Sequence, residues 1–73
     1  MDRKTLEPAI KSILSEIARL TANAARIGKA AEACANAGSI AEGVTVSMEI
    51  EQIAYEAGRL QDAASLLNRL SAD

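Results

Sequence analysis

The stretch NAGSIAE, residues 36–42, lies at the middle of the 73-residue chain and decides how the rest of it folds. Gly38 suits the C′ position just after a helix, because glycine adopts the left-handed backbone conformation at little cost. Ser39 is a typical N-cap residue, and Glu42 follows three residues later, as in a capping box. The stretch therefore predicts that one helix ends near residue 37 and that a second begins almost at once.

Apolar residues recur at alternating spacings of three and four on both sides of this turn, as in a heptad seam through which two helices pack. The first seam is Leu6, Ile10, Ile13, Ile17, Leu20, Ala24, Ile27, Ala31 and Cys34, and the second is Gly43, Val46, Ile50, Ile53, Ala57, Leu60, Ala64 and Leu67. We expect a first helix over about residues 5–37, with Thr5 as its N-cap and Pro8 in its first turn. A second helix should continue to about residue 71.

The start of the second helix has two possible positions. Gly43 and the β-branched residues 44–46 are weak helix formers, so the connection is either a tight turn at 38–39 or a loop over 38–46. Both alternatives are centred on the same point and give the same register. In that register large residues meet alanines across much of the seam, as with Ile13 opposite Ala64 and Leu20 opposite Ala57, and Cys34 falls opposite Gly43.

The predicted fold is all-α: an antiparallel two-helix hairpin, or helical coiled-coil hairpin, that forms a single domain over residues 1–73. Its core is thin, because alanine dominates the 49% of hydrophobic residues and Tyr55 is the only aromatic residue. Chains of this size bury a small fraction of their surface and often need a partner for stability. We therefore expect two hairpins to dimerise into a four-helix bundle.

Charge differs between the two halves of the chain. Residues 1–37 carry six basic and four acidic side chains, a net +2, and residues 38–73 carry two basic and six acidic ones, a net −4. The total of −2 gives no general attraction to nucleic acid or anionic lipid. No apolar run is long enough to span a membrane. Cys34 has no second cysteine to pair with, which favours a reducing, cytoplasmic location.

Charged residues also separate the two flanks of the seam. On one of them, here named the charged flank, three pairs of opposite charge fall opposite each other in the predicted register: Glu16 with Arg59, Arg19 with Glu56, and Arg26 with Glu49. Pairs in these positions can bridge antiparallel helices and help to set their orientation. We expect them to do so here.

The other flank has no charge at its e positions between Leu14 and Asn68. We name it the uncharged face and define it by Leu14, Ala18, Thr21, Ala25, Gly28, Ser47, Ala54, Gly58 and Gln61. Gly28 and Gly58 each cost a helix about 1 kcal/mol relative to alanine, which is easier to explain if another backbone approaches them closely. Two further leucines near the chain's end, Leu66 and Leu70, lie off the seam and also need cover. We expect these residues to bind a second copy or a helix of another protein.

Residues suited to catalysis are scarce. The chain has no histidine, the commonest general base and metal ligand at neutral pH. Cys34 occupies a seam position, which is typical of a small core residue rather than a nucleophile. Glu42, Glu49 and Glu56 form one stripe without the histidines that metal sites in helical bundles use. We therefore expect a non-enzymatic protein with no cofactor, metal or catalytic residues.

In length and architecture the chain resembles Rop-type hairpins, which dimerise into four-helix bundles and bind RNA. It is also similar to small helical-hairpin co-chaperones of type III secretion. The uncharged face predicts a structural or protein-interaction module, with an adaptor or small chaperone as its variant. The likeness to Rop-type hairpins implies the alternative, a Rop-like dimeric regulator that binds RNA or DNA. The composition favours the first, because the basic residues are scattered and no aromatic residue lies between them to stack on bases.

Overall fold

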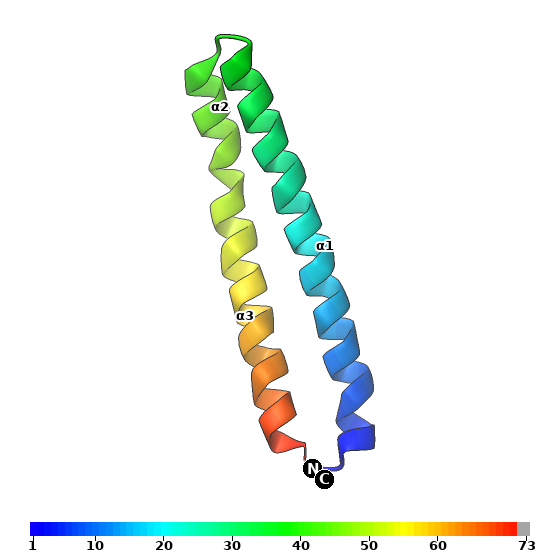
Figure 1. Cartoon of the computed structure of the whole chain (residues 1–73). Coiled ribbons are helices and arrows are strands. Elements are labelled where there is room, and N and C mark those ends of the chain that lie inside the picture. The colour runs from blue at the N-terminus through cyan, green and yellow to red at the C-terminus, as the bar shows by residue number, and fades with distance from the viewer. Residues whose placement is uncertain (72–73) are drawn as a thin grey trace.

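The structure, a computed structural model, describes residues 1–71 and is an all-helical hairpin (Figure 1). Helix α1 spans Arg3–Asn36, α2 spans Ile40–Ser47 and α3 spans Glu49–Leu70. Helices α2 and α3 follow one another along almost the same direction, and together they run antiparallel to α1 (Figure 1). The result is a rod of 55 × 14 × 11 Å with the turn at one end and both termini at the other.

The turn is built as the glycine at its centre predicts. Gly38 has a φ of 92°, and no other described residue has a positive φ. Its N–H donates to the Ala35 carbonyl at 3.0 Å, and the N–H of Ser39 donates to the Cys34 carbonyl at 2.8 Å. This pair of bonds is the Schellman motif that ends helices. Ser39 occupies the N-cap position of α2, but its side chain makes no capping hydrogen bond, so the expected capping box with Glu42 does not form.

The shorter of the two expected connections is the one present, because α2 begins at Ile40. The weak helix formers around Gly43 lie inside the helix. The irregularity appears later, at Met48, whose N–H bonds to the Thr45 carbonyl three residues back at 3.2 Å. This residue separates α2 from α3.

The first turn of α1 differs from the prediction. Asp2 is the N-cap, and its carboxylate accepts a hydrogen bond from the Lys4 N–H at 3.3 Å. Thr5 therefore lies inside the helix, and Pro8 lies beyond the first turn. A proline has no N–H, so it cannot donate to the Lys4 carbonyl four residues earlier. The prediction failed because aspartate caps a helix as well as threonine does, and Asp2 comes first in the chain.

Hydrogen bonds join α1 and α3 at the end of the rod opposite the turn. The amino group of Met1 donates to the Leu70 carbonyl at 2.9 Å, and the Arg3 guanidinium donates to the Ser71 hydroxyl at 2.6 Å. These bonds join the start of α1 to the end of α3 and hold the termini side by side.

The predicted seam is the core of the hairpin, because each of its positions is buried or half-buried. Leu6, Leu20 and Ala64 are the most deeply buried apolar residues, and no described side chain is less than 2% exposed. At the turn end, a Cβ atom on Gly43 would lie 3.6 Å from the Cβ of Cys34, so the predicted layer of these two residues is present. The core is continuous but thin.

Candidate interaction surfaces

Among the described residues, no three histidine, cysteine, aspartate or glutamate side chains come close enough to hold a metal ion. Cys34 is half-buried beside Gly43. In residues 1–71, no helix combines the length and the apolar character that crossing a membrane requires.

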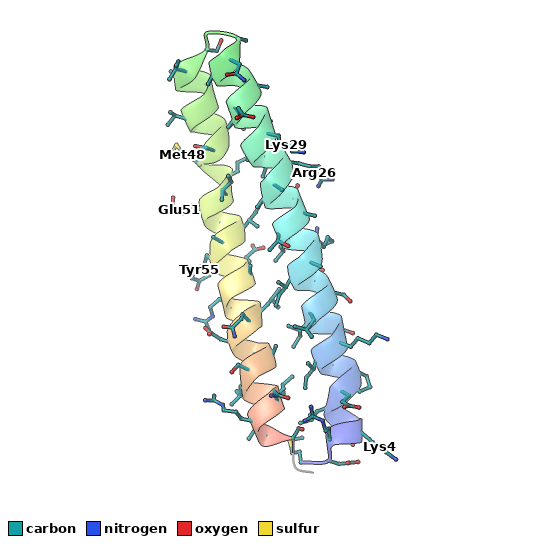
Figure 2. All side chains as sticks on the ribbon, viewed as in Figure 1. Lys4, Arg26, Lys29, Met48, Glu51 and Tyr55 are labelled. Atoms are coloured by element: carbon teal, nitrogen blue, oxygen red, sulfur yellow. The ribbon has the colours of Figure 1, made fainter. Side chains whose placement is uncertain are left out.

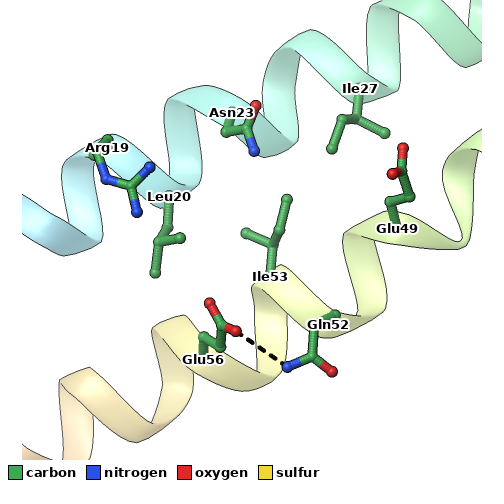
Figure 3. A pocket seen from close by; sticks show the side chains of 8 residues that line it. All are labelled: Arg19, Leu20, Asn23, Ile27, Glu49, Gln52, Ile53 and Glu56. Carbon is green, nitrogen blue, oxygen red and sulfur yellow. Dashed lines mark hydrogen bonds between the residues drawn. The ribbon is translucent and has the colours of Figure 1, made fainter.

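On the charged flank, side chains bond along their own helix and not across the hairpin. The Nε of Arg19 lies 3.0 and 3.1 Å from the two carboxylate oxygens of Glu16. Arg26 donates to Asn23 at 2.7 Å, and Gln52 donates to Glu56 at 3.1 Å (Figure 3). None of the three expected pairs is among the ion pairs of the described residues. That prediction is wrong, because a neighbour three or four positions away is within reach whatever the separation of the helices.

The Glu16–Arg19 pair shapes the electrostatics of this flank. The hydrogen bond from Arg19 holds the pKa of Glu16 below its ordinary value, and the same bond raises the pKa of Arg19. The charge of Glu56, on α3, raises the pKa of Arg19 further, by a smaller amount. Both Glu16 and Arg19 reach solvent, so the pair is a surface interaction of modest strength.

The basic side chains do not gather into one patch. Arg3 forms an ion pair with Glu7 at 3.2 Å, and Arg19 is held by Glu16. In Figure 2, Lys4 lies near the termini, while Arg26 and Lys29 project from the half of α1 that is nearer the turn. This arrangement adds no support to the nucleic-acid alternative, which needs a continuous basic surface.

The uncharged face runs along one side of the hairpin. Gly28 and Ser47 are half-buried, and the other residues that define the face are exposed. Leu14, its largest side chain, is 54% exposed. A Cβ atom added to Gly28 or Gly58 would meet nothing within 4 Å. The described chain therefore leaves open space above both glycines.

Two polar residues of the uncharged face already have hydrogen-bond partners. The hydroxyl of Thr21 donates to the carbonyls of Ile17 and Ala18 at 3.0 and 3.1 Å, and that of Ser47 donates to the Val44 carbonyl at 2.7 Å. Both hydroxyls therefore turn back onto their own helices. Burying a polar group is costly when the group has no hydrogen-bond partner. A partner protein can therefore cover these two residues at little cost.

Leu66 and Leu70 lie apart from the uncharged face. Each is 47% exposed, and their c and g heptad positions place them on the charged flank, near the end of α3. The helix geometry thus divides the predicted interface residues between two sides of the rod. Cover for these two leucines would have to come from a contact other than the one that covers the uncharged face.

The sequence reasoning missed a further apolar surface, here named the outer stripe. It consists of Ile40, Val44, Met48 and Tyr55, which are 58–64% exposed. Figure 2 shows Met48 and Tyr55, with Glu51 between them, on the edge of α2 and α3 that faces away from α1. The spacing of four, four and seven residues would have revealed it, but the valine was read only as a weak helix former.

No family model matches the chain, and neither a curated protein nor a solved structure is significantly similar to it.

Proposed function

We propose that this chain is a non-enzymatic structural and protein-interaction module that self-associates through its uncharged face. Two hairpins that pack through this face make a homodimeric four-helix bundle. The lone Cys34 suits such a protein to the reducing cytoplasm. In the adaptor or small-chaperone form of the same function, the face binds a helix of another protein.

The observation that carries the proposal is the large surface of the hairpin. Its solvent-accessible area is 5256 Å², whereas a compact monomer of this mass exposes about 4,300 Å². Its radius of gyration is 16.8 Å, against about 11 Å for a compact chain of this length. The excess area, about 1,000 Å², is similar to the roughly 800 Å² that each partner buries in a stable interface. A partner on one side of the rod would cover this excess.

The residues of the uncharged face support its choice as the interface. Leu14 offers apolar area, and the open space above Gly28 and Gly58 lets another helix approach closely. The hydroxyls of Thr21 and Ser47 keep their partners when covered. The charged flank is less suited to be the interface, because burial there would desolvate Glu16 and Arg19.

The test is the native mass in solution, measured by light scattering over a wide dilution series at two salt concentrations. We expect a dimer that persists at high salt. Ala54→Glu, on the uncharged face, should give a folded monomer, because each copy would bury an unpaired carboxylate. Ala22→Glu is the matched control, because Ala22 is an exposed helical alanine on the outer side of α1.

Circular dichroism verifies that each variant keeps its helices. A wild-type chain that stays monomeric at every concentration would show that self-association is wrong. If Ala54→Glu and Ala22→Glu both remain dimeric, the chain self-associates through another surface.

A further inference from the structure

We propose that the two copies pack antiparallel, with α1 against the partner's α1, α3 against the partner's α3, and the two turns at opposite ends of the bundle. This inference rests on the proposed function, because it specifies how the uncharged face meets its own copy. Its twofold axis crosses α1 at Thr21 and α3 at Ala54.

Charge complementarity is the first argument. Lys11 and Glu32 are exposed residues at b positions of α1, on the edge of the uncharged face. They lie 21 positions apart, or about 32 Å along a helix, so they cannot pair within one chain. With Thr21 on the twofold axis, Lys11 lies within one residue, about 1.5 Å along the helix, of the partner's Glu32, and the symmetry repeats this pair at the other end. Sliding the two α1 helices past each other by one or more heptads from this register separates Lys11 from the partner's Glu32.

Shape complementarity follows from the same register. Leu14 lies level with the partner's Gly28, where the structure leaves open space, and Ala18 lies within one residue of the partner's Ala25. Thr21 meets the partner's Thr21 with both hydroxyls bonded to their own helices. A large side chain thus fills the gap above a glycine, and alanines allow the two helices to approach.

The second pair of helices fits without a clash of charge. Ala54 meets the partner's Ala54, and Glu51 lies within one residue of the partner's Gly58, where there is open space. Glu51 is at the rim, so its carboxylate remains in water.

The parallel arrangement fits less well. A twofold axis along the rod would place α1 against the partner's α3 with both turns at one end. Glu32 would then lie level with the partner's Val44, and Lys11 with the partner's Ser65. This arrangement sets a carboxylate against an apolar side chain and forms no ion pair, so charge favours the antiparallel dimer.

Charge reversal and cross-linking test the arrangement together. At low salt, we expect Lys11→Glu and Glu32→Lys each to weaken the dimer about tenfold, because two attractive pairs become repulsive. The double variant should restore the wild-type dissociation constant to within about twofold. For cross-linking, Thr21→Cys in a Cys34→Ser background should form a disulfide-linked dimer under a glutathione redox buffer. Ala22→Cys in the same background is the control and should not.

Each result has one meaning. A dimer whose Thr21→Cys variant does not cross-link, and whose double charge reversal is not restored, overturns the antiparallel arrangement and leaves the proposed function standing. A chain that is monomeric at all concentrations overturns both. Restoration together with cross-linking at residue 21 supports the antiparallel dimer.

Discussion

Gly43 packs so closely against the backbone of Ala31 that a Cβ atom on the glycine would lie 2.7 Å from the Ala31 carbonyl oxygen. Side-chain carbons do not approach a backbone oxygen this closely without a shift of the structure. The residue that weakens α2 as a helix is therefore the one that lets α2 approach α1 beside the turn. The close packing that Gly43 allows stabilises the hairpin more than its poor helix propensity destabilises it.

We expect Gly43→Ala to lower the free energy of unfolding by about 1–3 kcal/mol, although alanine is the better helix former. The contact is with backbone, which cannot move aside as a flexible side chain would. Urea denaturation followed by circular dichroism measures the change, at one fixed protein concentration because association also adds stability.

Gly58→Ala is the matched control for this substitution. In the monomeric hairpin at high dilution the space around Gly58 is open, so only the gain in helix propensity remains, and we expect about 0.5–1 kcal/mol of added stability there. Equal effects of the two substitutions would contradict a close contact at Gly43.

Gly38→Ala tests the turn. The φ of 92° is strained for any residue with a Cβ atom, so we expect a loss of about 1–2 kcal/mol, although the side chain itself has room. The comparison is with Gly28→Ala in the dilute, monomeric chain, in which the backbone is helical and the space is open. A thermal scan showing no loss for Gly38→Ala would mean that the turn relaxes to another conformation.

Pro8→Ala should stabilise the hairpin. The alanine supplies the N–H that proline lacks, restoring a hydrogen bond to the Lys4 carbonyl, and the gain should be about 1 kcal/mol or more. Hydrogen exchange should slow over the first turns of α1. Ser12→Ala, an exposed change further along α1, serves as control and should have a smaller effect. No gain would indicate that residues 3–7 are frayed in solution.

Substitutions of Leu20 and Leu14 should distinguish an effect on folding from an effect on association. Leu20 is 5% exposed in the seam, so Leu20→Ala should cost about 2–4 kcal/mol of unfolding free energy. Leu14 is 54% exposed, so Leu14→Ala should leave a dilute hairpin nearly as stable but weaken the dimer. Light scattering and denaturation of the same samples distinguish the two effects. A stable dimer of the Leu14→Ala variant would contradict the proposed interface.

The Glu16–Arg19 pair predicts a small dependence of stability on pH. Because folding lowers the pKa of Glu16 from its ordinary 4.5, the pair stabilises the folded state above that pH. This contribution disappears as the pH falls through the lowered, folded-state pKa. We expect Glu16→Gln to be less stable than wild type at neutral pH and equal to it near pH 2, roughly two units below the ordinary value. Raising the salt concentration should reduce the difference. A difference that is independent of pH would point to packing instead.

The amino-acid sequence was sufficient to predict the hairpin and its register. Apolar residues every three or four positions define a single seam on each helix, and Gly38 marks the one place where the chain can reverse. A periodicity sustained over so many turns leaves little freedom, because rotation of either helix about its axis would expose its apolar stripe to water, and the short turn at Gly38 sets the register. The layer of Cys34 and Gly43 follows from that constraint.

Other features required the tertiary structure. The sequence could pair Arg19 with Glu56 across the hairpin, but only the structure shows it bound to Glu16 on its own helix. Likewise, the sequence places Gly43 in the seam and Gly28 on a flank, but only the structure shows that Gly43 meets the backbone of Ala31 while Gly28 faces open space. Periodic burial is a property of each helix alone, so sequence reveals it. Side-chain partners and close approaches depend on distances between helices, which exist only after the helices pack.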